Sequence, residues 1–383
     1  MRSPDPSRTD RAAGPRAGGG GGVGRALTIL HLTHQGGGAG STISIAALAA
    51  AQRGAGHRVL VGCPGGSLLA AMARGAGLEV RPMVFDRAAA VAARLVRLVE
   101  AERVDVVNSH ASRDRAACRR ARLAGRLDAA CVMTRRQMPR SLPVSVLLNG
   151  FAADCTIAVS RAVAQALVRR GAPAWRVRVV PNGVDLSRID REVSACEIDT
   201  ARALAGWRPW RPTVGVVARR KDHDVLLEAL ALLPEPLTVA LVGVEPDAEL
   251  SELAAAAPQH EVRCIPFRPD VLPFYRLFDA VALPSRAEGL SQALLEAMAL
   301  GLPVVASRAG GNVDVVTHGV DGLLVPPRDP AAFASALRRL LGDAALGRSL
   351  GERARCTARE RFTLQSTARL TEAAYQAALA QRR

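Results

Sequence analysis

Aromatic residues are scarce in this chain of 383 residues, where Phe, Trp and Tyr together make up 3%. Hydrophobic residues nevertheless account for 49% and charged residues for 22%, so the core must be built mainly from Ala, Val and Leu. Such a core suits a parallel sheet covered by helices better than a β-sandwich. The chain is also longer than one common-sized core requires, which predicts two domains.

Paired cysteines and long apolar runs are absent as well. The seven cysteines are scattered and never form Cys-x-x-Cys, which predicts a reducing compartment and no structural metal. No apolar run approaches the ~18 residues of a membrane-spanning helix, and the first residues lack the apolar segment of a signal peptide. We therefore expect a cytoplasmic protein without a structural metal; no other cofactor is predicted.

Lysine is almost missing: Lys221 is the one lysine among 51 basic residues, and the others are arginine. The formal net charge of +16 would suit a nucleic acid or a membrane surface as partner. The arginines are spread along the chain with few aromatic residues between them for base stacking, which argues against nucleic acid. Peripheral contact with anionic lipid at the inner face of a membrane stays an expectation.

The order of apolar and polar segments predicts an α/β fold. Residues 1–24 are rich in Pro, Gly and Arg without periodicity and are predicted to be a disordered tail. Alternating strands and helices then predict a Rossmann-like domain over 25–185 and, after a polar connector, a second one over 186–363. A last helix within 364–383 is expected to cross back to the first domain. The ligand cleft should lie between the domains, at the carboxyl ends of the strands.

Two glutamates stand out in the segment AEGLSQALLEAMALGLPVVASRAGG, residues 287–311. Glu288 lies on a Gly-containing loop at the mouth of a predicted helix, and Glu296 lies two turns along it. Eight residues of helix rise about 12 Å, which is the reach of a bound nucleoside diphosphate joined to a sugar. An amphipathic helix with two surface acids would show the same spacing, so the pair needs support from the rest of the chain.

Lys221 gives that support. It follows the predicted strand PTVGVVA and precedes a predicted helix, and a compact ammonium at such a place makes a phosphate site. Arg219 is close enough in sequence to assist. The neighbouring Asp222-His223-Asp224 has the form of an Asp-x-Asp metal site, but acidic residues are also favoured in the first turn of a helix. No metal site is predicted there.

The segment 287–311 closely resembles the Glu-x7-Glu segment of retaining GT-B glycosyltransferases of family 4, also called glycosyl transferases group 1. Further segments resemble that family in the expected order over residues 26–345. They are GGGAG (36–40), GAGHRV (54–59), VDVVNSH (104–110), AVSRAV (158–163), RVVPNGVD (178–185), KDHDVLLEAL (221–230), FRPDV (267–271), DAVALPS (279–285) and DGLLVPP (321–327). The resemblance implies the GT-B fold, in which two doubly wound Rossmann-like domains face a central cleft.

The resemblance also implies roles on the donor side of that cleft. Glu288 would face the donor sugar, and Glu296 would accept hydrogen bonds from the ribose hydroxyls. Lys221 and Arg219 would bind the diphosphate and stabilise its charge as it leaves, without a metal.

Backbone groups would complete the donor site. The N–H groups of Gly289, Leu290 and Ser291, at the start of the helix that holds Glu296, would bind phosphate oxygens. Gly37 and Gly38 have no side chains and would let the turn of the first domain approach the diphosphate and the acceptor.

The acceptor side is less defined. His110 ends a predicted strand and either faces the cleft or packs and caps locally. The family commonly has a histidine after the strand that here ends in Met133-Thr134, and this chain has Arg135-Arg136 instead. Arg136 cannot act as a base and would bind an acid or phosphate of the acceptor. Only one residue separates Arg219 from Lys221, fewer than in most relatives, which makes the role of Arg219 less certain.

The resemblance therefore implies transfer of a sugar from a nucleoside-diphosphate donor to an acceptor hydroxyl, with retention at the anomeric carbon. Cell-surface glycan, lipopolysaccharide or glycolipid synthesis would supply such an acceptor. Two alternatives stay open at this point. One is an isomerase of the nucleotide-sugar 2-epimerase type, which acts on the donor alone. The other is a non-catalytic protein that binds a nucleotide sugar.

Overall fold

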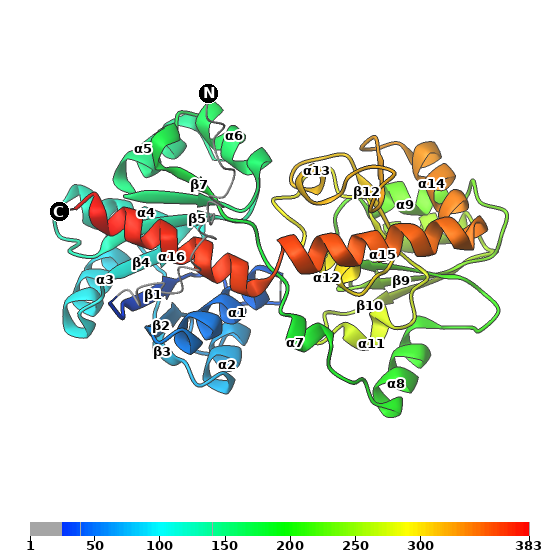
Figure 1. Cartoon of the computed structure of the whole chain (residues 1–383), viewed down its shortest axis with the longest axis horizontal. Coiled ribbons are helices and arrows are strands. Elements are labelled where there is room, and N and C mark those ends of the chain that lie inside the picture. The colour runs from blue at the N-terminus through cyan, green and yellow to red at the C-terminus, as the bar shows by residue number, and fades with distance from the viewer. Residues whose placement is uncertain (1–24, 39, 140, 383) are drawn as a thin grey trace, which may run out of the picture.

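The computed structural model describes residues 25–38, 40–139 and 141–382. The predicted disordered tail lies outside the described residues. Two lobes lie side by side, each a sheet with helices on both of its faces (Figure 1). Every strand pairing within the sheets is parallel, and the two sheets are separate. The predicted α/β class with two Rossmann-like units is therefore confirmed.

The N-terminal lobe holds a seven-stranded sheet in the order β3-β2-β1-β4-β5-β6-β7. Its strands are β1 Thr28–Leu32, β2 Arg58–Cys63, β3 Glu79–Pro82, β4 Val106–Ser109, β5 Ala130–Arg135, β6 Cys155–Ala158 and β7 Val177–Val179. Its helices are α1 Gly40–Gly54, α2 Leu68–Gly75, α3 Ala88–Glu102, α4 Ser112–Leu123, α5 Pro143–Ala152 and α6 Arg161–Arg169, with a short 3-10 turn at Ala174–Arg176. Central strands β1, β4, β5 and β6 are almost wholly buried, including the polar residues that end β4 and β5.

The C-terminal lobe holds a six-stranded sheet in the order β10-β9-β8-β11-β12-β13. Its strands are β8 Thr213–Val217, β9 Thr238–Val242, β10 Glu261–Ile265, β11 Ala280–Leu283, β12 Val304–Ser307 and β13 Leu323–Val325. Two connector helices, α7 Leu186–Ile189 and α8 Ala195–Ala205, precede it. The remaining helices are α9 His223–Leu230, α10 Ala248–Ala255, α11 Leu272–Tyr275, α12 Gln292–Ala299, α13 Asn312–Val315, α14 Pro330–Gly342, α15 Ala344–Arg361 and α16 Leu364–Ala380.

The chain passes between the lobes twice, and the two passages are hydrogen-bonded to each other. The N–H of Val184 donates to the carbonyl of Phe362 at 2.8 Å, and the N–H of Leu364 donates to the carbonyl of Val184 at 2.9 Å. A Cβ on Gly183 would lie 2.2 Å from the carbonyl oxygen of Thr363, so only glycine fits at this approach. The two crossings therefore form one paired connection.

Helix α16 returns along the N-terminal lobe, where it packs on α1, β5 and β6 (Figure 1). Tyr375 of α16 is fully buried in the apolar core of that lobe, and its hydroxyl accepts a hydrogen bond from Asn108 at 2.7 Å. Helix α15, by contrast, packs on α12 of the C-terminal lobe. Within the described part of the chain, no helix combines the length and the apolar character needed to span a bilayer.

Candidate functional site

A cavity lies between the lobes, where the carboxyl ends of strands from both sheets face each other. From the N-terminal lobe it is lined by the start of α1 and by the segment after β5, including Gly38, Ser41 and Arg136. From the C-terminal lobe it is lined by the ends of β8 and β9 and by the segment that leads into α12, including Arg219 and Lys221. The position agrees with the place where doubly wound sheets bind ligands.

Lys221 and Glu288 meet in this cavity. Lys221 Nζ donates to Glu288 Oε1 at 2.8 Å, and the Glu288 side chain is only 8% exposed. The turn that carries Lys221 is held from two sides. The N–H of Lys221 donates to His223 Nδ1 at 2.9 Å, and Asp222 accepts from the N–H of Arg286 at 2.9 Å. The lysine and the carboxylate are thus fixed from separate strand ends.

The loop around Glu288 is compressed between two backbones. A Cβ on Gly289 would lie 2.1 Å from the carbonyl oxygen of Arg136, and one on Gly310 would lie 2.1 Å from that of Glu288. Gly311 approaches Gly289 just as closely, and its N–H donates to the carbonyl of Glu288 at 3.0 Å. These glycines let the loop pass between the lobes, which places Glu288 in the cavity.

The prediction that Glu288 stands at the mouth of the helix that holds Glu296 is wrong in detail. Helix α12 begins only at Gln292, with Ser291 as its N-cap, whose hydroxyl accepts from the N–H of Leu294 at 3.3 Å. Residues 288–291 form a loop, and Gly289 within it packs closely on the backbone of Arg136. The distance of about 12 Å estimated from helical rise therefore does not apply.

Glu296 lies in the second turn of α12 and is 4% exposed. Its Oε1 accepts a hydrogen bond from Arg188 Nη2 at 2.5 Å. Burial raises the pKa of Glu296, and the charge of Arg188 opposes that rise. Gln292 and Tyr275 also lie beside this carboxylate and, like Arg188, favour its charged form. Glu296 lines the cavity between the lobes.

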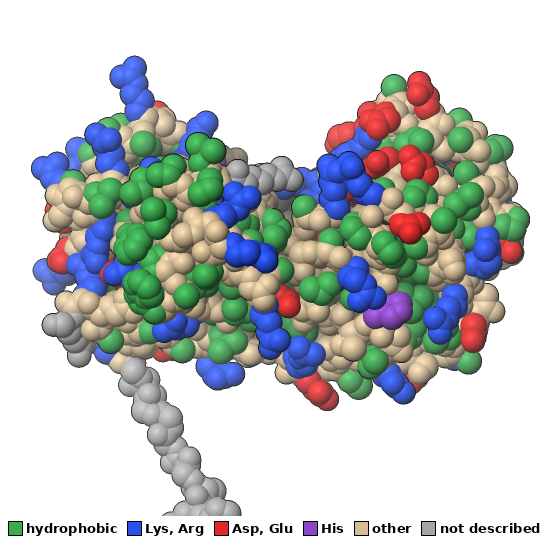
Figure 2. Space-filling model, turned by 90° about the horizontal axis from the view of Figure 1, so that it is seen from above, with side chains coloured by type: hydrophobic (Ala, Val, Ile, Leu, Met, Phe, Trp, Pro, Cys, Tyr) green, Lys and Arg blue, Asp and Glu red, His purple; other side chains and the backbone are tan. Residues whose placement is uncertain are grey.

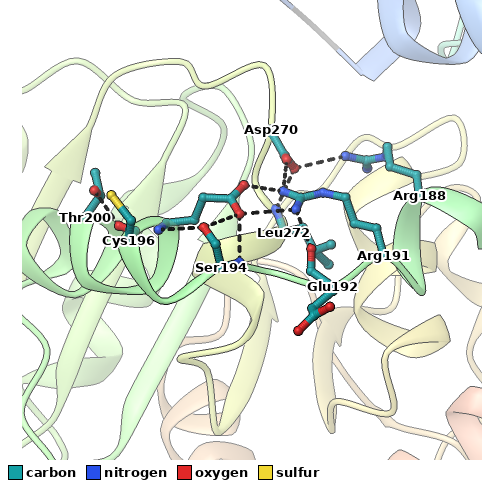
Figure 3. Close-up of polar contacts among 9 residues, drawn as sticks. Arg188, Arg191, Glu192, Ser194, Cys196, Thr200, Asp270 and Leu272 are labelled. Atoms are coloured by element: carbon teal, nitrogen blue, oxygen red, sulfur yellow. Dashed lines mark hydrogen bonds and ion pairs between the residues drawn. The ribbon is translucent and has the colours of Figure 1, made fainter.

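Arg188 belongs to a charged cluster on the connector, which Figure 3 shows. Arg188 lies 3.6 Å from Asp270, and Arg191 also forms an ion pair with Asp270. Arg191 donates in addition to Glu197, which forms a capping box with Ser194 at the start of α8. Asp270 precedes α11 in the C-terminal lobe, so the cluster ties the connector to that lobe and holds Arg188 against Glu296. Sequence reasoning missed Arg188 because no motif surrounds it.

Of the other predicted donor-side residues, Gly38, Arg219, Leu290 and Ser291 line the cavity. A Cβ on Gly38 would lie 2.7 Å from the ring of Phe267, so the close approach of the two lobes requires glycine there. Gly37 and Gly289 do not line the cavity. The carbonyl of Gly37 instead accepts from the hydroxyl of Thr42 at 2.6 Å, which fixes the turn before α1.

His110 lies apart from Lys221 and Glu288. It follows β4, is 6% exposed, and stacks on His31 with ring centroids 5.2 Å apart. Its Nε2 is 2.9 Å from Nδ1 of His31, whose Nε2 is in turn 2.7 Å from Gln52 Oε1. Burial lowers the pKa of His110 well below its usual value. It lines a second, adjoining cavity, which shares Ser41, Arg136 and Gln137 with the first.

Arg136 stands between the two cavities. Its Nη1 donates to Asn182 Oδ1 at 2.7 Å, and the amide of Asn182 also donates to the carbonyl of Leu290 at 3.4 Å. Arg136 therefore contacts the loop of Glu288 through both its own carbonyl and Asn182. Within the described residues, no group of three or more His, Cys, Asp or Glu side chains is arranged to hold a metal ion.

Comparison with known families gives two matches that together cover most of residues 38–343. Residues 38–188 match the model described as Glycosyltransferase Family 4, and residues 211–343 match the one described as Glycosyl transferases group 1. The chain is 36% identical over 210 residues to the D-inositol 3-phosphate glycosyltransferase of Jonesia denitrificans. It is 38% identical over 227 residues to that of Salinispora arenicola.

These alignments span about half of each protein. They cover 50% of this chain and 49% of the Jonesia protein, and 53% of this chain and 50% of the Salinispora protein. Solved structures match over nearly the whole chain. The glycosyltransferase from Rickettsia africae ESF-5 has a TM-score of 0.78 at 20% identity and covers 93% of this chain and 99% of its own. Anabaena Alr3699/HepE in complex with UDP-glucose has a TM-score of 0.79 at 23% identity, and the match covers 91% of this chain and 99% of the Anabaena chain.

Proposed function

This chain belongs to the family 4, or group 1, glycosyltransferases and has their GT-B fold, and on that premise we propose a specific reaction for it. It transfers a sugar from a nucleoside-diphosphate donor to a hydroxyl of an acceptor, with retention at the anomeric carbon. The observation that carries the proposal is the pair of Lys221 and Glu288 inside the cavity between the lobes, with Arg219 beside it.

Lys221 supplies the positive charge that the reaction needs. As the bond between the sugar and the diphosphate breaks, negative charge accumulates on the leaving phosphate oxygens. An ammonium fixed in a partly buried cavity stabilises this charge more than it stabilises the bound donor. In the structure, Glu288 holds the ammonium in place. A bound diphosphate would take over that contact and leave Glu288 to the hydroxyls of the sugar.

The two carboxylates are assigned to different parts of the donor. Glu296 accepts hydrogen bonds from the ribose hydroxyls, while Arg188 holds one of its oxygens. The departing phosphate takes the proton of the acceptor hydroxyl on the same face of the sugar. That route explains why a histidine or carboxylate base beside the acceptor is not required. UDP and UDP-glucose are bound by the Anabaena relative, which makes uridine nucleotides the first donors to test.

A donor panel separates this proposal from its alternatives. An epimerase would convert the nucleotide sugar without any acceptor, and a non-catalytic protein would bind it without turnover. A transferase requires the acceptor for conversion beyond slow hydrolysis. The panel starts with thermal-shift screening of nucleoside diphosphates and their sugars, since binding of none of them would contradict the whole proposal.

The decisive variant is Lys221→Ala. Removal of one charge that stabilises the transition state is expected to lower kcat about 100-fold or more. Arg220→Ala is the matched control, because Arg220 is the next residue but forms ion pairs with Asp247 and Glu249 instead of lining the cavity. Equal kcat in Lys221→Ala and the wild type would refute the diphosphate role.

A further inference from the structure

Three arginines, two of them buried and one half-buried, line the second cavity, the one that adjoins the donor site. Arg115 of α4, Arg135 at the end of β5 and Arg136 line it together with the start of α4 at Ala111 and Ser112. We refer to these three arginines and their cavity as the arginine pocket. Arg115 is 9% exposed and Arg135 is 5% exposed, so the two positive charges are almost wholly removed from solvent.

None of the three arginines forms an ion pair with a described residue. Arg115 donates to the carbonyl of His110 at 2.9 Å, and Arg136 donates to the amide oxygen of Asn182. The side chain of Arg135 forms no hydrogen bond with the part of the chain that the structure describes. Asp114 is the carboxylate nearest in sequence, but it accepts from the N–H groups of His110 and Ala111 and from His34.

Two other partly buried arginines have carboxylate partners. Arg188 pairs with Glu296, and Arg122 pairs with Asp154 at 2.5 Å. A buried charge without a partner is costly to the fold, and burial lowers the pKa of Arg115, Arg135 and Arg136 alike. Three such charges around one cavity therefore indicate that an anionic ligand completes it.

We propose that the arginine pocket binds a phosphate monoester carried by the acceptor. Arginine is suited to phosphate because its planar fork makes paired hydrogen bonds to two oxygens. A phosphate monoester brings up to two negative charges and three acceptor oxygens, which fits three guanidinium groups better than a carboxylate does. The N-terminal end of the 12-residue helix α4 adds a favourable dipole at Ser112.

The position of the pocket fits the proposed reaction, on which this assignment of the ligand to an acceptor rests. The arginine pocket shares Arg136 and Gln137 with the donor cavity. A phosphate held by Arg115 and Arg135 would therefore leave the rest of the acceptor pointing toward Glu288 and the donor sugar. The binding of phosphate itself does not depend on transfer and can be measured separately.

The test titrates inorganic phosphate by calorimetry into four proteins: the wild type, Arg135→Gln, Arg120→Gln and Lys221→Ala. We expect Arg135→Gln to weaken one phosphate-binding event at least 10-fold. Arg120→Gln is the matched control, because Arg120 is an exposed arginine of α4 outside the pocket. Lys221→Ala should keep this event, since Lys221 belongs to the donor cavity.

Further measurements distinguish failure of the phosphate-binding proposal from failure of the transferase proposal. Nucleoside diphosphate binding should be unchanged in Arg135→Gln, and inositol 3-phosphate should bind at least 10-fold more tightly than inositol to the wild type. Phosphate binding that is equal in the wild type and Arg135→Gln would overturn the pocket. Tighter binding of succinate than of phosphate would overturn the choice of a phosphate monoester.

A second surface feature lies on the outer side of the same lobe. Helix α5 and its surroundings expose large apolar side chains, which we call the α5 face: Leu142, Val144, Leu147, Leu148, Phe151 and Trp175. Phe151 is 56% exposed and Trp175 is 65% exposed. Arg176 follows Trp175 in the chain and donates to the backbone carbonyl of Phe151 at 2.6 Å, which links the two segments. Exposed apolar groups gathered in this way mark an interaction surface.

Positive charge surrounds the α5 face. Between residues 136 and 184 the only acidic residue is Asp154, which is buried and paired with Arg122. The same stretch carries exposed Arg161, Arg169 and Arg178. Figure 2 looks onto this side of the molecule and shows hydrophobic side chains gathered on the N-terminal lobe with basic side chains among and around them, while acidic side chains gather on the other lobe.

From this charge pattern we infer that the α5 face docks on an anionic lipid bilayer. The apolar side chains would enter the boundary between headgroups and acyl chains, and the arginines would contact lipid phosphates. An acidic protein partner would also meet the arginines, but a bilayer accounts for both the apolar centre and its basic surroundings. The acceptor-side cavity and the α5 face belong to the same lobe, so docking would bring that lobe to membrane-located substrates.

Cosedimentation with vesicles tests this inference on the full chain. Vesicles with 30% phosphatidylglycerol in phosphatidylcholine are compared with pure phosphatidylcholine, at low and high salt. We expect binding to the anionic vesicles alone, and at least five-fold weaker binding by Leu148→Ser/Phe151→Ser. Trp210→Ser is the control, because Trp210 is 75% exposed on the other lobe. Equal binding by the double variant, or self-association that the double variant abolishes, would overturn docking on lipid.

Discussion

Glu296 is held by a residue that no sequence motif marks. Arg188 donates a hydrogen bond to one carboxylate oxygen of Glu296 and is itself positioned by Asp270, which precedes α11. Burial raises the pKa of this carboxyl, and the charge of Arg188 opposes that rise and so favours the charged form. A charged acceptor is what the ribose hydroxyls need, because hydrogen bonds to charged groups are stronger than those to neutral ones.

The variant Glu296→Gln tests this assignment. We expect the affinity for the nucleoside diphosphate to fall by about 1–3 kcal/mol, since the charge-assisted hydrogen bonds are lost. Calorimetry measures this affinity with the nucleotide that the thermal-shift screen identifies. Glu252→Gln, at an exposed position of α10, serves as the control. Unchanged affinity in Glu296→Gln would remove the ribose role, provided that the circular dichroism spectrum shows a folded protein.

Arg135 makes the opposite kind of contribution, because its charge is buried without a partner. Arg135→Met is expected to raise the free energy of unfolding of the unliganded protein by about 1–4 kcal/mol, the range found when buried charges are replaced by apolar side chains of similar size. Urea unfolding measures the change, with Arg120→Met expected to stay near the wild type. A loss of stability in Arg135→Met would mean that the guanidinium already has a compensating contact.

The stacked histidines make stability depend on pH. Burial lowers the pKa of His31 to about 4, below its value in the unfolded chain, so the unfolded state takes up the proton first as the pH falls. The contribution of neutral, buried His31 to stability is therefore fully present above about pH 6.5 and is lost as the pH falls toward 4. For His31 alone this amounts to about 3 kcal/mol. Urea unfolding at pH 7 and pH 4.5 tests it, and His31→Gln should reduce the difference.

At the scale of elements, the loop of Glu288 depends on three glycines. Gly289→Ala would place a Cβ 2.1 Å from the carbonyl oxygen of Arg136, in the other lobe. We expect a loss of about 1–3 kcal/mol in stability, as for overpacking elsewhere, and at least a 10-fold fall in kcat because Glu288 shifts. Gly66→Ala is the control, since a Cβ there meets nothing within 4 Å. Wild-type kcat in Gly289→Ala would show that the loop adapts.

The same loop shows where sequence reasoning succeeds and where it stops. Alternating apolar and polar segments predicted both sheets, because strands buried on two faces leave a clear apolar run. The start of α12 was predicted too early, since Leu290 continues the apolar pattern although it lies in the loop before the helix. Ser291 was a signal that could have placed the start correctly, because serine is a preferred N-cap.

The candidate site was predictable to the extent that its residues lie in local motifs. Lys221, Glu288 and Glu296 each follow a strand end or a glycine turn, and all three line one cavity. Arg188 and the missing partners of Arg115 and Arg135 were not predictable, because they depend on which distant segments meet. His110 was placed beside the cleft in one of two interpretations, and the structure places it in the adjoining cavity with His31.

At the scale of the whole molecule, the N-terminal lobe depends on the end of the chain. Ala374, Tyr375 and Ala378 of α16 are part of its apolar core. Removal of residues 364–383 is therefore expected to expose β5 and β6 and to unfold that lobe. Limited proteolysis should then leave fragments of the C-terminal lobe intact and degrade the N-terminal lobe. Equal resistance of both lobes would mean that α16 is dispensable for folding.

The paired crossings at Val184 and Thr363 have a consequence for engineering. Because the chain leaves and re-enters the N-terminal lobe at neighbouring points, the intervening C-terminal lobe is a continuous insertion into a discontinuous domain. A donor-binding lobe could therefore be exchanged between relatives through two joints that lie side by side. The graft would carry the contacts of α15 with α12 intact and leave the recipient to keep its own α16.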